Sequence, residues 1–346
     1  MGRSDRGAIG GGTMNDVDII GLLRKRVGSP FEAGFEGGRC VALSLFDEAH
    51  PAGGLVRHHT AAEKQEILGL VARLAGLRHL NLRKNNLAHI PESFSTLHGL
   101  VSLNLGSNQL REVPGFVFRN PGLEQLFLGS NPITELDEAL FSLARLRSLH
   151  LHKLQLRGVP AGFSALSQLE TLHLYLSGLK EFPAEMFDCR LLSSLSFGFS
   201  PLRRLPDEIG QLSRLKYFTL VVTKVACLPD SFCGLSELVA TRLYKNRIER
   251  LPDGIGGLEK LEQLTLYQNR LQGLPRSFAG LGRLEKLNLA QNLFTACPDV
   301  LGSLPRLRWF AFFDNPASGT PTALPKEVLT VAARPFGGRA PEWAED

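Results

Sequence analysis

Cysteines are few in this sequence and show no pairing pattern. The five are scattered, with no C-x-x-C among them: Cys40, Cys189, Cys227, Cys233 and Cys297. An odd, scattered set argues against a disulfide framework and favours reduced, mostly buried thiols. Since reduced thiols are typical of the cytosol, we expect a cytoplasmic protein.

Long apolar runs are also missing. No stretch approaches the ~20 consecutive apolar residues of a membrane-spanning helix, so we expect no membrane association. Residues 1–14 are rich in glycine and lack the apolar core of a secretory signal. We expect these residues to form a flexible tail, or translation to start at Met14. A non-cleaved export signal is the alternative.

Catalytic motifs are absent as well. The sequence has no G-x-x-x-x-G-K-[ST], no H-E-x-x-H, no G-x-S-x-G, and no dinucleotide fingerprint after a strand. No cysteine has a predicted histidine and acid beside it, so a thiol nucleophile is unsupported. We therefore expect a protein that is not an enzyme and needs no cofactor.

What the sequence does have is a strict repeat. From Leu77 onward, the motif L-x-x-L-x-L-x-x-N-x-L returns with a 23-residue period, ten times without a change of register. The leading leucines are Leu77, Leu100, Leu123, Leu146, Leu169, Leu192, Leu215, Leu238, Leu261 and Leu284, and Leu307 opens a partial copy. Such a period indicates a solenoid, in which each repeat packs against its neighbours and the array serves as a binding surface.

The second copy shows what each repeat position is expected to do. Leu103 and Leu105 are two residues apart, so they share the core face of a short strand, while Ser102 and Asn104 point outward. Stacked copies then form a parallel sheet whose outward residues line a concave side. Asn108 can satisfy backbone groups that the turn buries. Proline in the returning segment blocks another strand, which predicts 3₁₀ or irregular turns on the convex side.

The segments on either side of the array are expected to cap it. Apolar spacing predicts helices over residues 17–27 and 63–74 and a preliminary strand over 41–45, and residues 324–329 suggest a terminating helix. The predicted parts are a tail (1–14), an N-terminal cap (15–76), the repeat array (77–315) and a C-terminal cap with a tail (316–346).

The extended consensus, L-x-x-L-x-L-x-x-N-x-L-x-x-L-P-x-x-F-x-x-L, resembles the leucine-rich repeat family, and residues 261–281 match it almost letter for letter. The 23-residue spacing is similar to that of the intracellular Ras-group and bacterial subclass. The resemblance implies an α/β fold, a right-handed solenoid curved like a horseshoe, with a concave parallel sheet, short convex turns and a helical N-terminal cap. It also implies protein–protein recognition on the concave sheet, often in signalling or host–pathogen settings.

The asparagine position varies along the array. It reads Asn85, Asn108, Asn131, then Leu154, Ser177, Ser200, Thr223, then Asn246, Asn269, Asn292, Asn315. Serine and threonine replace part of the hydrogen bonding of asparagine, and leucine replaces none. The central copies are therefore either the product of neutral drift or a region reshaped around a ligand.

Aromatic residues and cations occupy the outward strand positions, where a patch of rings commonly marks an interaction site. The candidate partner-binding residues are His150, His152, His173, Tyr175, Phe199, Tyr217, Arg242, Tyr244, Lys245 and Tyr267. A rim of rings packed on one another is the alternative interpretation. Predicted cations outnumber acids on this face, although the net charge of the chain is only +5. This favours an acidic, partly apolar protein partner over nucleic acid, whose binding sites cluster their cations.

Three of these candidates are histidines on adjacent repeats. His150, His152 and His173 lie within reach of one metal ion, as in three-histidine zinc sites, but no carboxylate is predicted nearby to orient them. We expect solvent-exposed recognition histidines that tune binding near pH 6–7. The predicted function is a monomeric, non-catalytic scaffold for protein binding. The alternatives are a bacterial effector delivered into host cells and a metal-binding protein.

Overall fold

The computed structural model describes residues 14–28, 30–45, 59–317 and 329–331. The chain divides into two compact units: residues 1–109 with 114–120, and residues 110–113 with 121–346. The boundary between the two units lies inside the repeat array.

Two helices form the start of the first unit, as predicted. Helix α1 (Asp16–Val27) begins after Asn15, whose side chain accepts a hydrogen bond from the Asp18 amide. Helix α2 (Ala61–Val71) begins at a capping box in which Thr60 and Glu63 satisfy each other's backbone amides. Both helices bury an apolar stripe.

The strand predicted over residues 41–45, ahead of the repeat array, is confirmed. It also pairs with a second strand that the sequence did not predict. Strand β2 (Arg39–Ser44) pairs in parallel with β3 (His79–Asn81), which pairs with β4 (Ser102–Asn104). Strand β1 (Glu32–Glu36) pairs with β2 in antiparallel fashion. The turn between them uses Gly37 and Gly38, both with positive φ.

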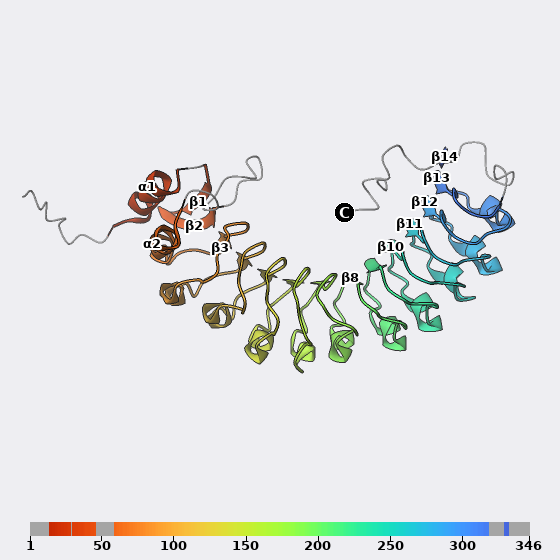
Figure 1. The fold of residues 1–346 in the computed structure, drawn as a ribbon, viewed down its shortest axis with the longest axis horizontal. Coiled ribbons are helices and arrows are strands. Elements are labelled where there is room, and N and C mark those ends of the chain that lie inside the picture. The colour runs from red at the N-terminus through yellow and green to blue at the C-terminus, as the bar shows by residue number, and fades with distance from the viewer. Residues whose placement is uncertain (1–13, 29, 46–58, 318–328, 332–346) are drawn as a thin grey trace, which may run out of the picture. The chain divides into compact units, whose positions relative to one another are not determined.

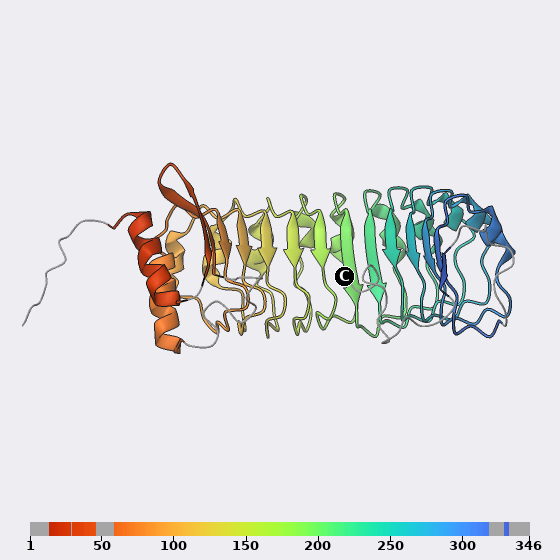
Figure 2. The same ribbon diagram turned by 90° about the horizontal axis from the view of Figure 1, so that it is seen from above.

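The second unit contains one parallel strand per repeat, and neighbouring strands are consecutive in sequence. The strands are β5 (Gln125–Phe127), β6 (Ser148–His150), β7 (Thr171–His173), β8 (Ser194–Gly198), β9 (Tyr217–Val221), β10 (Ala240–Arg242), β11 (Gln263–Thr265), β12 (Lys286–Asn288), β13 (Trp309–Ala311) and β14 (Leu329–Val331). In Figure 2 they run side by side. We call their outward surface the strand face.

Short 3₁₀ helices form the returning segments, which confirms the predicted convex turns. The first unit has η1 (Glu92–Thr96) and η2 (Gly115–Arg119); the second has η3 (Glu138–Ser142), η4 (Phe163–Ala165), η5 (Ala184–Asp188), η6 (Asp207–Gln211), η7 (Asp230–Gly234), η8 (Ile255–Gly257), η9 (Arg276–Gly280) and η10 (Asp299–Ser303). Proline directly precedes most of them and sets the entry angle of the chain. In the second unit the strands lie on the inner side of a curved stack and the 3₁₀ helices on its outer side (Figure 1).

The asparagine position carries the hydrogen bonding that the sequence predicts. The Asn246 side-chain amide donates to the carbonyls of Leu220 and Leu243, one in the preceding repeat and one in its own, both at 2.8 Å. Among the central copies, Thr223 donates to Asn246 Oδ1 at 2.6 Å. At Ser177 the main chain replaces a bond of the asparagine, because the Ser177 carbonyl oxygen accepts from the Leu156 amide at 2.7 Å, as Asn131 Oδ1 accepts from the Leu110 amide in an earlier repeat.

The end of the array differs from the prediction. Residues 324–328 of the expected terminating helix lie outside the described residues, and Leu329 begins β14, which pairs in parallel with β13. No helix in the described part of the chain is long and apolar enough to cross a membrane.

The thiols match the prediction in part. All five cysteines are free, and Cys40 and Cys189 are buried, but Cys227 is exposed.

Candidate functional site

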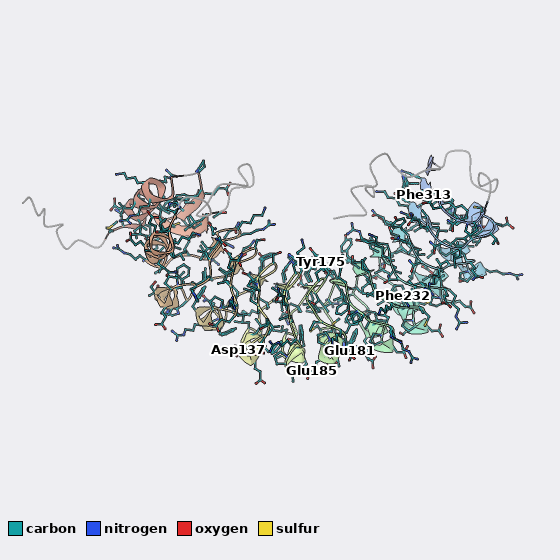
Figure 3. The ribbon with its side chains drawn as sticks, in the orientation of Figure 1. Asp137, Tyr175, Glu181, Glu185, Phe232 and Phe313 are labelled. Carbon is teal, nitrogen blue, oxygen red and sulfur yellow. The ribbon has the colours of Figure 1, made fainter. Side chains whose placement is uncertain are left out.

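Each repeat of the second unit presents three outward positions on the strand face, and equivalent positions recur with the 23-residue period. The pairing of Ser148 with Thr171 and of His150 with His173 defines the first and second positions. The pairing of Gly198 with Val221 defines the third. A 23-residue offset thus places two side chains on adjacent strands. Figure 3 shows Tyr175 and Phe313, both at the third position, on the inner side of the stack.

Five rings from three adjacent repeats pack together on the strand face. The ring centroids of Phe127 and His150 are 4.4 Å apart, and those of His150 and His173 are also 4.4 Å apart. His152 stacks on Tyr175 with centroids 5.1 Å apart and an interplanar angle of 7°. We call Phe127, His150, His152, His173 and Tyr175 the ring cluster.

The sequence interpretation found four members of the ring cluster and missed Phe127. The position of Phe127 in the repeat could have revealed it. Phe127 lies 23 residues before His150, at the equivalent position, and the two residues pair on adjacent strands.

The ring cluster is held by contacts that its own repeats provide. Ser148 Oγ lies 3.0 Å from His150 Nε2, within hydrogen-bonding distance. Gly129 lies beneath the His152 ring, and a Cβ atom at this position would overlap the ring atoms. A side chain at residue 129 would therefore displace His152 from its stack on Tyr175.

All three histidines are less exposed than predicted, and burial lowers the pKa of two of them. His150, His152 and His173 are all partly buried. Burial lowers the pKa of His150 to about 3, and the neighbouring His173 and His152 contribute to the shift. Burial also lowers the pKa of His173. The expectation that these residues titrate near pH 6–7 is therefore wrong for His150, which presents a neutral ring at neutral pH.

The lowered pKa of His150 makes folding stability pH-dependent. A histidine in the unfolded chain has a pKa of about 6.5. Between that value and about 3, the unfolded chain therefore binds a proton that folded His150 does not. The stabilisation is fully present above pH 6.5 and is lost as the pH falls towards 3, by at most about 1.4 kcal/mol per pH unit for one group.

We expect His150→Phe to keep a ring beside Phe127 and to flatten the fall in stability on acidification. Urea unfolding of both proteins between pH 4 and 6.5 measures the two slopes, and their difference isolates His150 from the titrating carboxylates. Parallel slopes would contradict the lowered pKa.

The three histidines are not arranged to hold a metal ion. Among the described residues, which include all three, no group of three or more histidine, cysteine, aspartate or glutamate side chains has that arrangement. The rings of His150 and His173 meet edge to face, and the His152 ring is stacked on Tyr175. The geometry argues against the metal-binding alternative and favours ring packing.

The other candidates spread away from the ring cluster along the strand face. Tyr217 is 52% exposed, and its strand partners are the small residues Ser194 and Ala240. Phe199 is 47% exposed. Arg242, Tyr244, Lys245 and Tyr267 belong to the two repeats that follow. Val221, which occupies the third outward position, is only 3% exposed.

Several acids lie at the 3₁₀ helices, on the side away from the strand face. Asp207 and Glu208 are in the first turn of η6, and Asp137 caps η3 by accepting a hydrogen bond from the Ala139 amide. Figure 3 shows Asp137 and Glu185 on the outer side of the stack. On the strand side, Asp314 accepts a hydrogen bond from Gln291 Nε2 at 3.0 Å.

Comparisons with known proteins agree with this architecture. The sequence model of the family described as leucine rich repeat matches residues 69–110, 98–156 and 241–294. A leucine-rich repeat protein of Leptospira interrogans is 31% identical, with a TM-score of 0.70, and the match covers 75% of this chain and 64% of that protein. The chain thus spans less than two thirds of that relative. No curated protein matches the sequence.

Two further solved structures share the fold. An internalin, InlF, of Listeria monocytogenes is 20% identical with a TM-score of 0.68, and the match covers 87% of this chain and 82% of that one. The plant peptide hormone receptor RGFR1, solved in complex with RGF2, is 27% identical with a TM-score of 0.60, and the match covers 75% of this chain and 44% of that one. The 23-residue period, the strand and 3₁₀ units and these matches together identify the chain as a leucine-rich repeat protein whose array is a solenoid.

Proposed function

We propose that this protein is a non-catalytic scaffold that binds an acidic, partly apolar protein partner on the strand face of its second unit. The observation that carries the proposal is the ring cluster with the exposed rings beside it. Five rings are already packed on an outward surface, and Tyr217 and Phe199 stand exposed in the next two repeats.

Packed rings suit recognition because they offer large apolar area at little cost in side-chain entropy. Aromatic side chains are enriched where binding energy concentrates, and rings that pack on one another before binding have less freedom to lose. The neutral state of His150 adds to this, since a neutral ring is cheaper to desolvate than an imidazolium.

Cations beside the rings support an acidic partner. Lys153 and Lys245 are exposed at the edge of the strand face, and Arg242 is partly exposed within it. Complementary charge orients a partner and speeds encounter.

Likeness to known proteins supports the general class. Leucine-rich repeat proteins are generally scaffolds for protein interaction, and the plant receptor among the similar structures was solved with RGF2. We further propose the intracellular subclass of Ras-group and bacterial proteins, from the 23-residue spacing, and a monomeric, cytoplasmic protein that acts in signalling.

The test replaces three rings at the third outward position. We expect Tyr175→Ala, Tyr244→Ala and Tyr267→Ala, combined in one variant, to abolish capture of the partner that the unaltered protein retains from native lysate. The control variant, Glu138→Ala with Asp207→Ala and Asp253→Ala, removes three exposed acids of the outer side and should capture as before. Both variants should keep the far-UV spectrum of the unaltered protein. Undiminished capture by the triple tyrosine variant would refute the proposed surface.

A further inference from the structure

One position has a left-handed backbone in every repeat. It lies directly before the asparagine position, where the chain leaves the strand, and its φ is between 53° and 60°. In the second unit these residues are Ser130, Lys153, Leu176, Phe199, Val222, Lys245, Gln268, Gln291 and Asp314. We call them the rim row, because they follow the last outward position along one edge of the strand face.

Three central members of the rim row are apolar, and this is costly. The left-handed region is disfavoured for residues with a Cβ atom, and a bulky or β-branched residue there is a genuine outlier. Val222 is β-branched with φ 53°, and Phe199 has φ 55°. Phe199 is also 47% exposed, and Leu176 and Val222 are partly exposed. These residues therefore combine backbone strain with contact to water, and core packing does not explain them.

The rim row is continuous through these repeats. From Ser130 to Gln291, the amide of each member donates to a carbonyl of the next repeat, at 3.1 Å from Leu176 to Gly198 and at 2.9 Å from Phe199 to Val221. Corresponding bonds join Lys153, Val222 and Lys245 to their neighbouring repeats. Successive members therefore follow the strand spacing of about 4.8 Å.

A lysine flanks the apolar triplet on each side. Lys153 precedes Leu176 in the rim row, Lys245 follows Val222, and both lysines are exposed. Neither forms an ion pair with another described residue. The order along this edge is thus one cation, three apolar side chains and one cation.

We propose that this stretch of the rim row binds a short extended segment of a partner protein that runs across the strands. The segment has apolar side chains at its centre and an acidic side chain towards each end. Four strand spacings separate the lysines, about 19 Å, which an extended chain covers in about six residues. The inference rests on the proposed protein-binding function and names the chemistry that one edge of the surface recognises.

The strain makes the proposal testable without loss of the fold. Asparagine tolerates the left-handed region better than leucine, phenylalanine or valine. A variant with Leu176→Asn, Phe199→Asn and Val222→Asn should therefore melt at the same temperature as the unaltered protein or higher. Its matched control, Ser130→Asn with Gln268→Asn and Gln291→Asn, places asparagine at the same register in three repeats outside the triplet, where no apolar side chain is removed.

The experiment selects peptides from a displayed library of random heptapeptides on the full chain and both variants. We expect the unaltered protein and the control to enrich apolar heptapeptides flanked by aspartate or glutamate, with at least tenfold less enrichment on the Leu176, Phe199 and Val222 variant. A further variant, Lys153→Glu with Lys245→Glu, should select basic flanks instead. No enrichment of such peptides, or equal enrichment on the triplet variant, would overturn the proposal, as would a lowered melting temperature of that variant.

Two measurements separate this inference from its alternatives. If the triple tyrosine variant still enriches the heptapeptides and still captures the lysate partner, the rim row stands and the proposed tyrosine surface fails. If the rim variant loses the peptides while the tyrosine variant loses the partner, both stand. The unaltered protein could instead form a concentration-dependent dimer that the triplet variant does not form. That result would show that this edge binds a second copy of the chain, and it would overturn the proposal of a partner segment.

Discussion

Replacing Asn269 by alanine is expected to lower the free energy of unfolding by about 3–5 kcal/mol. The side-chain amide donates to the carbonyls of Leu243 and Leu266 at 2.8 and 2.9 Å, and Oδ1 accepts from the Ile248 amide at 3.0 Å. Each bond contributes about 1 kcal/mol net, and a buried group left without its partner costs about 1–3 kcal/mol. Asn269 is only 7% exposed, so water cannot readily replace the lost bonds. Urea unfolding monitored by circular dichroism measures the change.

Ser200→Ala is the matched control because Ser200 occupies the same register in a central repeat. Its hydroxyl donates to the Lys180 carbonyl and accepts from the Leu202 amide, each at 3.3 Å. Two long bonds contribute less than three of ordinary length, so we expect a loss of about 1 kcal/mol or less. Equal losses of unfolding free energy in the Asn269 and Ser200 variants would show that the asparagine hydrogen bonds do not stabilise the stacking of the repeats.

The second large effect is expected on the outer side of the same unit. Gly256 lies in η8 (Ile255–Gly257), and a Cβ atom there would overlap the backbone oxygen of Ser277 in η9 (Arg276–Gly280). Because backbone cannot rotate away as a flexible side chain does, Gly256→Ala must push the two 3₁₀ helices apart. We expect a loss of about 3 kcal/mol, at the upper end of the range for overpacking.

The neighbouring glycine provides a matched control. A Cβ atom at Gly257 would lie 3.7 Å from the Cys233 carbonyl oxygen, an ordinary van der Waals distance. Gly257→Ala should therefore change stability by less than about 1 kcal/mol. Thermal unfolding of the two alanine variants makes the comparison, and a Gly257 variant as unstable as the Gly256 variant would mean that backbone conformation, not contact, governs this turn.

Most of the fold follows from the period of the sequence, and the exceptions have local causes. A 23-residue repeat assigns each leucine to the core and each intervening position to the outward face, so the period alone predicts where the strands and the 3₁₀ helices lie. Strand β1 was missed because residues 32–36 lie outside the repeat and their short alternation, with Ala33 and Phe35 as its apolar members, buries no side chain fully. The predicted terminating helix was wrong at Leu329, which continues the parallel sheet.

The sequence predicted which residues of the candidate site are neighbours, but not how buried they are. A shift of one repeat moves one strand along the sheet, so His150 and His173 were expected to be neighbours, and they pair. Phe127 was overlooked although the same rule places it beside His150. The exposure of the histidines and the pKa of His150 were mispredicted, because burial depends on rings that neighbouring strands contribute.

The sequence by itself determined which residues face the core, which face outward, and which repeats depart from the consensus. Only the tertiary structure decided how buried the outward residues are, what their pKa values are and which of them have a strained backbone. The lowered pKa of His150, the room that Gly129 leaves for His152, and the left-handed backbone at Phe199 all arise in the stacked array. The physical reason is that burial and strain depend on atoms a full repeat away along the chain, and these come together only when adjacent repeats stack.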